Sequence, residues 1–395
     1  MTLITTSLFF VSCAEDPDGS PSTLPLPSMK FTDLTITEQD IDDTLSIPLI
    51  LAGENKTNAI VRFAVLPGSA MADLDYRVLT EGRLVFAPGD STKNIDIVII
   101  GDGVKEPGES FIIQYYNPIN LTTPVEKQTI TIRDDDDNTA GLVIPQSGYA
   151  TPTSYAGYKL VWADEFEGSE LNADNWSHET GTGNNGWGNN ELQYYREDNT
   201  SLVNGHLVIT AKSQRFGGND YTSSRIKTQG KKSFKFGRVD IRAALPKGQG
   251  IWPALWMLGT NITSVGWPAC GEIDIMELTG DQTNRVLGTV HYGTNFDQRG
   301  SKTQSIFLEE GKNFHDEFHV FSIIWKENLI EFYMDDIKYH TITPASVGNA
   351  PYPFNKNFFF IMNVAAGGNL PGSPDATTPF PQSMIVDYIR VFQPE

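Results

Sequence analysis

Short runs in which apolar and polar residues alternate dominate the chain from Met29 to about Asp137. Runs such as RLVFAP, KNIDIVIIGDG and KQTITIRDDDD are separated by Gly, Pro and Asp. Alternation with a period of two residues is typical of strands that are buried on one face. About seven strands at this spacing predict a small antiparallel β-sandwich of the Ig-like type.

The strand pattern continues from Tyr158 to Gln393, where aromatic residues become frequent and where all seven tryptophans of the chain lie. The stretch 138–153 is rich in Gly, Pro, Ser and Thr, a composition that predicts a linker. We therefore expect an all-β protein with a small domain at 29–137 and a larger domain at 154–395.

Length and charge agree with two domains and narrow the range of partners. The chain has 395 residues, more than one average domain of about 150 residues. Its 29 Lys and Arg against 49 Asp and Glu give a formal net charge of -20, and 22 of the acidic residues but only 9 of the basic ones precede residue 138. Repulsion between like charges argues against nucleic acid, anionic lipid and sulfated polysaccharide as partners. A neutral substrate or a cationic ligand is favoured.

Residues 1–28 are expected to be an export signal and a spacer. The run SLFFVSC resembles a bacterial lipobox, in which Cys13 would become the lipidated first residue of the mature protein. No Lys or Arg precedes the apolar run, so a start farther upstream and a piece of buried core remain alternatives. We expect an exported protein, either a cell-surface or outer-membrane lipoprotein or a secreted one.

The order of the strand runs between ADLDYRVL and TITIRDDDD resembles a Calx-beta domain over nearly the whole small domain. Acidic residues fall at the ends of its loops, where hard cations find oxygen ligands. Calcium binding and solvated charges at strand ends are both compatible with these positions, which are Asp102, Glu106, Glu109 and Asp134 to Asp137.

The run GEIDIMELTG carries the strongest chemical signal. Glu272 and Asp274 are two residues apart, so their side chains point to one face of a strand. Glu277 lies three residues beyond Asp274 and reaches the same face only if the strand has one extra residue. We therefore predict a β-bulge around Ile275 and Met276 and three carboxyl groups on one surface.

Such an arrangement suits the hydrolysis of a glycosidic bond with retention of configuration, which needs a nucleophile and a general acid about 5 to 5.5 Å apart. Glu272 and Glu277 are expected to converge across the bulge. Asp274 would share a proton with one neighbour and help to keep Glu277 protonated. A solvated strand face is the alternative, but the acids alternate with Ile and Met in the most aromatic part of the chain.

GEIDIME resembles the active-site signature of glycoside hydrolase family 16, in the subgroup that has the bulge, and the resemblance covers Tyr158 to Gln393. The flanking runs GIWPALWMLG and GWPACGEIDIMELTG are most similar to laminarinases, the endo-1,3-β-glucanases. The resemblance implies a β-jelly-roll with an open cleft on its concave sheet. It also implies that catalysis needs no cofactor. Glu272 would be the nucleophile, Asp274 the assisting acid and Glu277 the acid/base.

Aromatic rings and neutral polar groups recognise a neutral sugar. The resemblance places three tryptophans and several polar residues at the substrate. An internal ion pair for Glu191, a surface salt bridge for Arg225 and a core position for His291 are the alternatives. The candidates are Trp252, Trp256, Trp267, Asn185, Glu191, Arg225, His291 and Asn363.

The resemblance also implies a structural calcium ion held by Glu165, the carbonyl of Gly205 and Asp387. The six histidines show no paired spacing typical of zinc sites. Cys270, next to the catalytic strand, has no His and Asp or Asn partners in its vicinity and is expected to be a buried small hydrophobe.

The function expected from the sequence is a retaining endo-hydrolase of laminarin-like β-1,3-glucan, acting as a monomer. Within the same family, the alternatives are a mixed-linkage β-1,3-1,4-glucanase and an agar-type galactan hydrolase. A third alternative is an inactive glucan-binding surface protein, against which the complete set of three acids argues.

Overall fold

The computed structural model describes residues 25–39, 41–101, 108–123, 126–134 and 142–395. These residues form two compact units that divide after Arg133. Cys13 and most of the acidic loop residues of the small domain lie outside the described residues. Glu109 and Asp134 are described, the first opening a strand and the second directly following one.

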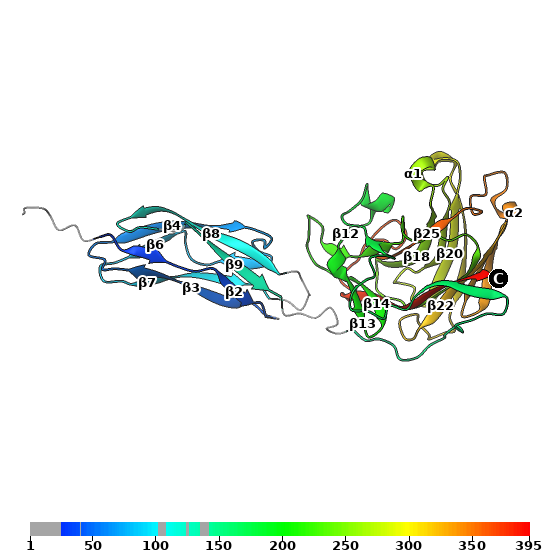
Figure 1. Ribbon diagram of the computed structural model, residues 1–395, viewed down its shortest axis with the longest axis horizontal. Coiled ribbons are helices and arrows are strands. Elements are labelled where there is room, and N and C mark those ends of the chain that lie inside the picture. Colours follow the sequence, from blue (N-terminus) through cyan, green and yellow to red (C-terminus); the bar gives the residue numbers. More distant parts are fainter. Residues whose placement is uncertain (1–24, 40, 102–107, 124–125, 135–141) are drawn as a thin grey trace, which may run out of the picture. The chain divides into compact units, whose positions relative to one another are not determined.

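The small unit is a sandwich of two sheets around one apolar core (Figure 1). The predicted sandwich is confirmed, with one difference: β2 and β9 are parallel to each other. Inward residues such as Ile47, Ile95 and Phe111 are fully buried and alternate with neighbours that are more exposed. One sheet has the order β1 (Ser28–Lys30), β3 (Asp43–Ala52), β7 (Thr92–Ile99), β5 (Tyr76–Val78), and the other β2 (Leu34–Thr37), β9 (Lys127–Arg133), β8 (Glu109–Ile119), β4 (Ala59–Pro67), β6 (Arg83–Phe86).

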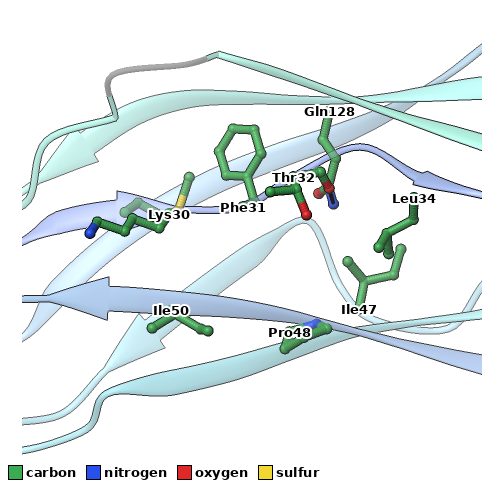
Figure 2. A pocket seen from close by; sticks show the side chains of 9 residues that line it. Lys30, Phe31, Thr32, Leu34, Ile47, Pro48, Ile50 and Gln128 are labelled. Atoms are coloured by element: carbon green, nitrogen blue, oxygen red, sulfur yellow. Dashed lines mark hydrogen bonds between the residues drawn. The ribbon is translucent and has the colours of Figure 1, made fainter.

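The chain crosses from one sheet to the other between β1 and β2, and a hollow of about 380 Å³ lies beside this crossing. Figure 2 shows Phe31 on the crossing segment and Leu34 at the start of β2, with Ile47, Pro48 and Ile50 of β3 opposite. β1 pairs only with Ile50 to Ala52 of β3, so Ile47 and Pro48 have a strand partner on the β7 side alone. Most of the side chains that line the hollow are apolar.

The large unit is a jelly-roll sandwich of a seven-stranded and an eight-stranded sheet, as predicted (Figure 1). Fully buried residues of both sheets, among them Leu255, Met362, Ile241 and Val391, fill the space between them. In the first sheet the order is β11 (Ser177–His178), β16 (Arg225–Lys227), β25 (Phe358–Ala366), β18 (Ile251–Gly259), β19 (Glu272–Glu277), β20 (Arg285–Tyr292), β21 (Gly300–Phe307).

The second sheet has the order β13 (Thr200–Val203), β14 (His206–Ala211), β26 (Gln382–Pro394), β17 (Gly237–Ala244), β22 (His319–Lys326), β23 (Leu329–Met334), β24 (Ile337–Ile342), with β10 (Tyr158–Asp164) also paired to β26. A short parallel pair, β12 (Gln193–Tyr195) and β15 (Tyr221–Ser223), stands beside the sandwich. The α-helices are single turns, α1 (Ile262–Val265) and α2 (Pro344–Val347). Within the described part of the chain, none of the helices has the length and apolar character to cross a membrane.

Residues 142–155, here called the strap, differ from the expected linker because they pack on the large unit. Leu142 and Ile144 contact a buried apolar cluster that includes Phe318. The backbone N–H of Tyr149 donates to the carbonyl of Phe318, and that of Thr151 to the hydroxyl of Tyr388 at 2.9 Å. Much of the predicted linker is therefore part of the large unit.

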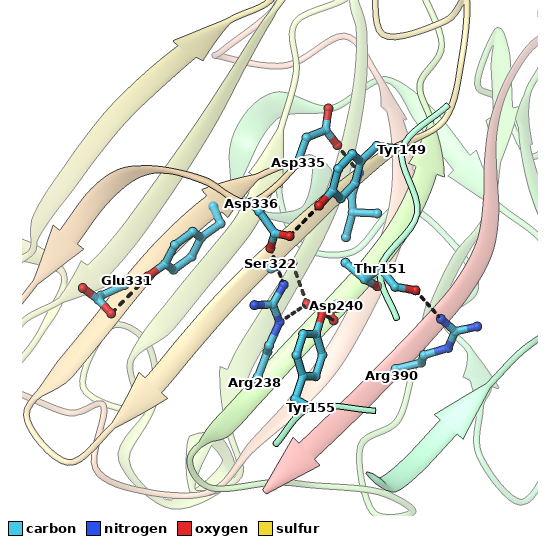
Figure 3. Close-up of polar contacts among 12 residues, drawn as sticks. Tyr149, Thr151, Tyr155, Arg238, Asp240, Ser322, Glu331, Asp335, Asp336 and Arg390 are labelled. Carbon is cyan, nitrogen blue, oxygen red and sulfur yellow. Dashed lines mark hydrogen bonds and ion pairs between the residues drawn. The ribbon is translucent and has the colours of Figure 1, made fainter. Parts of the chain in front are cut away.

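A buried polar network joins the strap to the outer face of the eight-stranded sheet (Figure 3). Arg238 and Asp240 of β17 point to this face because they alternate with the core residues Val239 and Ile241. Asp240 is fully buried and accepts hydrogen bonds from the hydroxyl of Tyr155 (2.7 Å), from the hydroxyl of Ser322 and from Arg238. The carboxylate needs these donors, since an unpaired buried charge is strongly unfavourable.

Candidate active site

The catalytic strand β19 lies between β18 and β20 and contains the predicted bulge. On the β18 side, Leu255 pairs with Met276, whereas the next residue, Trp256, pairs with Asp274. Ile275 is therefore the extra residue. The pairing with β20 shows the same irregularity between Asp274 and Glu277. The prediction of a bulge around Ile275 and Met276 is confirmed.

Because of the bulge, all three acids face one cleft while Ile273, Ile275 and Met276 face the core. Glu272, Asp274 and Glu277 all line this cleft, which has a volume of about 880 Å³. Asp274 is 4% exposed and Glu277 9% exposed. The acids are thus withdrawn from bulk water but open to a ligand in the cleft.

Burial raises the pKa of all three acids. The pKa of Glu272 rises to about 7 through desolvation, while hydrogen bonds from Trp267 and Asp274 and the charge of Arg225 act in the opposite direction. Desolvation and the charges of both glutamates raise the pKa of Asp274 well above its ordinary value. Burial, together with the charge of Glu272, raises the pKa of Glu277.

Both glutamates act on Asp274, because the charges of Glu272 and Glu277 raise its pKa. The protonated form of Asp274 is therefore favoured between them. Its expected role, to share a proton with one neighbour and help to keep Glu277 protonated, stays a prediction.

Three indole N–H groups donate into the site, one from each tryptophan predicted to face the sugar. Trp267 donates to Oε2 of Glu272 at 3.0 Å, and Trp252 donates to Oε1 of Glu277 at 3.2 Å. The third indole, that of Trp256, donates to Oδ1 of Asn363 at 2.8 Å. All three rings line the cleft, so they both orient polar groups and offer apolar faces.

His291 also lines the cleft. It pairs in register with Glu272, and its Nε2 atom lies 3.4 Å from Oδ2 of Asp274 and 3.7 Å from Oε1 of Glu272. Desolvation lowers the pKa of His291, which favours the neutral ring, while the charge of Glu277 acts in the opposite direction. The ligand atoms of His291, Glu272 and Asp274 lie within 4.8 Å of one another.

Asn363 and Arg225 are cross-strand neighbours on the floor of the cleft. Asn363 accepts from Trp256 and donates to the hydroxyl of Tyr195 at 3.1 Å. Arg225 forms an ion pair with Glu179, with 2.6 Å between Nε and Oε2, and its guanidinium lies over the rings of Trp187 and Trp256. The ion pair is largely buried, in contrast to the surface salt bridge that was the alternative, and Arg225 also lines the cleft.

Of the two residues expected from the loop before β12, the structure brings Glu191 to the cleft but not Asn185. Glu191 lines the cleft and accepts hydrogen bonds from Asn189, Gln193 and Tyr195, so it holds a hydrogen-bond cluster without the ion pair that was the alternative. Asn185 is not among the lining residues.

The sequence interpretation missed Trp187, Gly188 and Asn189, which line the cleft in place of Asn185. Trp187 has a φ of 54°, between two glycines that also have positive φ. The run G-W-G could have indicated this turn, because glycines often flank a residue with positive φ, a conformation that bulky residues seldom adopt.

The sequence interpretation also missed the residues that line the other end of the cleft. Phe296, Asp297 and Arg299 follow β20, and with Thr289 and Thr303 they line the side of the cleft away from Trp187. Polar loop composition gave no signal for these positions.

The three residues expected to bind calcium converge along β26. Along β26, β14 pairs with residues before Asp387 and β10 with residues after it. Glu165 follows the end of β10 and Gly205 precedes the start of β14, so the pairing brings both toward Asp387. Both carboxylate oxygens of Glu165 accept from Arg390, at 2.8 and 2.7 Å, and Asp387 accepts from Arg242 at 2.6 Å.

Cys270 is fully buried beside the catalytic strand. Burial raises its pKa to about 11, so the group stays a neutral thiol at neutral pH.

Comparison with known proteins gives two family matches. The model of "Glycosyl hydrolases family 16" matches residues 185–390, and that of "Calx-beta domain" matches residues 26–136. The chain is similar to the clotting factor G alpha subunit of Tachypleus tridentatus (38% identity, 60% of this chain and 34% of the relative) and to glucan endo-1,3-beta-glucosidase A1 of Niallia circulans (39% identity, 62% and 39%). It thus spans little more than a third of these curated relatives.

Solved structures match the large unit more completely. The laminarinase catalytic domain from Thermotoga maritima MSB8 is 44% identical, with a TM-score of 0.57 over 60% of this chain and 99% of that one. The shared region is therefore a whole catalytic domain of that protein.

Proposed function

Because the chain belongs to glycosyl hydrolase family 16, we propose that its large unit is a retaining endo-1,3-β-glucanase. The observation that carries the proposal is the bulge in β19, which turns Glu272, Asp274 and Glu277 into one cleft. Two of these acids also accept hydrogen bonds from indoles, which orient them.

In the first step, Glu277 donates its proton to the glycosidic oxygen while the carboxylate of Glu272 attacks the anomeric carbon. The carbon–oxygen bond to the leaving sugar breaks, and an ester forms between Glu272 and the remaining chain. The raised pKa of Glu277 keeps the proton available, and Trp267, Arg225 and Asp274 favour the charged form of Glu272.

In the second step, the carboxylate of Glu277 takes a proton from water, whose oxygen attacks the same carbon and releases Glu272. Two displacements restore the original configuration. Asp274 keeps its proton throughout and donates to Glu272, which suits a group whose pKa is raised by two neighbouring glutamates.

The proposed substrate is a laminarin-like β-1,3-glucan. Supporting it are the names of the Niallia circulans relative and of the Thermotoga maritima structure, together with a cleft lined by tryptophans and neutral polar groups. A mixed-linkage β-glucan and an agar-type galactan are the alternatives within the family. The complete set of three acids in the cleft favours hydrolysis over glucan binding alone.

The deciding experiment is digestion of laminarin, lichenan, agarose and carrageenan in parallel, with linkage analysis of the products. We expect laminarin to be cut fastest, at internal bonds, and the newly formed reducing ends to appear first as the β-anomer by NMR. The Glu272→Gln variant is the control for contaminating activity. Faster cleavage of lichenan or agarose would assign another substrate, and binding without cleavage of any of the four would make the protein a binding module.

We further propose a structural calcium ion at Glu165, Gly205 and Asp387. Hard oxygen ligands suit calcium. In support, Glu165 and Gly205 adjoin the segments of β10 and β14 that pair with β26 next to Asp387. Arg390 and Arg242 donate to the two carboxylates, and Nε2 of His206 lies 3.6 Å from Oδ1 of Asp387. Since each carboxylate offers about four acceptor positions, lone pairs remain for an ion. An ion here would join the first and last strands of the unit.

For the cellular location, we propose an exported, monomeric protein, lipidated at Cys13. The apolar run before Cys13 and the acidic residues after it support this proposal. A Cys13→Ala precursor should lose labelling by a fatty-acid probe and appear in the medium. Equal labelling of the variant and the parent would contradict lipidation.

A further inference from the structure

The connection between β20 and β21 carries an exposed aromatic ring at the end of the cleft. Phe296 is 60% exposed, and its neighbours in the sequence are polar. It lines the cleft, and its ring centroid lies 5.9 Å from that of Trp267, which donates to Glu272. An exposed apolar ring that continues a sugar-facing surface has no role in the core.

The loop holds this ring in place before any ligand arrives. Oδ1 of Asn295 accepts from the backbone N–H groups of Asp297 and Gln298, at 3.0 and 3.1 Å. Arg299 donates to the carbonyl of Phe296 at 2.7 Å, and its guanidinium lies 3.9 Å from the centroid of the Phe296 ring. One face of the ring is thus covered by a cation, and the residue is still mostly exposed.

The position of Phe296 relative to the catalytic strand defines which part of the glucan it would meet. The sheet order is β16, β25, β18, β19, β20, β21, so the β20–β21 connection and Arg225 of β16, with Trp187 over it, lie on opposite sides of β19. A chain bound across the acids therefore reaches Trp187 with one arm and Phe296 with the other.

We propose that Phe296 is a sugar-stacking platform that binds a pyranose ring of the glucan arm opposite Trp187, and that Arg299 and Asn295 position it. The flat ring offers its free face to the C–H groups of a pyranose, and the guanidinium on the other face is poised to donate to nearby hydroxyls. A preorganised loop loses little conformational entropy on binding. This inference rests on the proposed glucanase function.

The test compares Phe296→Ala with Phe307→Ala, measured on laminarin and on end-labelled β-1,3-gluco-oligosaccharides of increasing length. Phe307 is a matched control, because it is 57% exposed at the end of β21 but is not part of the cleft lining. We expect Phe296→Ala to raise KM for long oligosaccharides about 3- to 10-fold and to shift the preferred bond, with little change for those too short to reach the loop.

A conservative variant and a measurement of the parent separate the outcomes. Phe296→Tyr should restore the parent KM and cleavage pattern, and melting curves show whether each variant is folded. An unchanged KM and cleavage pattern in folded Phe296→Ala, on an active parent enzyme, would overturn the platform. A folded parent that cleaves no β-1,3-glucan would instead overturn the proposed function.

Discussion

The indole Nε1–H of Trp267 donates to Oε2 of Glu272 at 3.0 Å, so the nucleophile candidate is held through one of its two oxygens. The acid/base candidate has an equivalent partner, because Trp252 donates to Oε1 of Glu277 at 3.2 Å. Each indole thus combines an apolar face for a sugar with a donor that orients a reacting carboxyl group. Loss of either donor should alter chemistry as well as binding.

Substitution of the two glutamates distinguishes their roles. Glu272→Gln and Glu277→Gln should each lower kcat by at least about 10²- to 10⁴-fold, since one loses the nucleophile and the other the proton donor. Both should keep the parent melting temperature and glucan affinity. With azide, Glu272→Ala should give an α-glycosyl azide and Glu277→Ala a β-glycosyl azide. The opposite anomers would reverse the assignment.

The hydrogen bond from Trp267 should be visible in the pH profile. It lowers the pKa of Glu272, which burial raises to about 7, so its removal raises that pKa further. In Trp267→Phe, the acidic limb of kcat/KM should therefore move to higher pH by about 1 unit, the effect of a hydrogen bond to a charged group.

Trp256→Phe is the matched control for this shift, because its indole donates to Asn363 and to neither glutamate. It should weaken glucan binding without moving the acidic limb. The same displacement of the limb in both variants would mean that the shift comes from loss of an aromatic ring in general.

Removal of calcium should affect stability more than catalysis. Chelation should lower the melting temperature of the large unit by several degrees, because a ligand that binds only the folded state stabilises it. Asp387→Asn should abolish this sensitivity, while Asp316→Asn, an exposed substitution elsewhere, should keep it. A melting curve of the parent that does not respond to chelator or to added calcium would refute the site.

The sequence predicted the chemistry better than the loops. Period-two alternation and its break at Ile275 identified the strand, the bulge and the common face of Glu272 and Glu277, because these follow from local geometry. The choice between Asn185 and Trp187 depended on backbone angles that the local composition does not determine. The position of Phe296 depended on a hairpin end returning to the cleft, which is a tertiary property.

The strap was misjudged because its composition resembles a linker. Its Gly, Pro, Ser and Thr residues are also suited to an extended segment that lies on a sheet. Only a few residues, such as Tyr149 and Tyr155, anchor it through side-chain contacts with distant strands. Pairing at such sequence separations cannot be inferred from a local pattern.

Loss of the hydroxyl of Tyr155 should destabilise the full chain. Tyr155→Phe should lower the free energy of unfolding by about 1–3 kcal/mol, because buried Asp240 loses a donor. Thermal melting of the variant and the parent measures this effect.

The strap determines where the large unit begins. A chain that starts at Ser154 lacks Leu142 and Ile144, which pack on the cluster around Phe318, and lacks Thr151, which bonds the hydroxyl of Tyr388. This chain should melt well below a longer one that starts at Leu142. The longer chain should keep kcat/KM on laminarin within a few-fold of the full-length value. The measurements are thermal melting and initial rates for both truncated forms. Equal melting temperatures of the two would mean that the strap contributes nothing to the unit, and loss of activity in the longer form would show that the small unit takes part in catalysis.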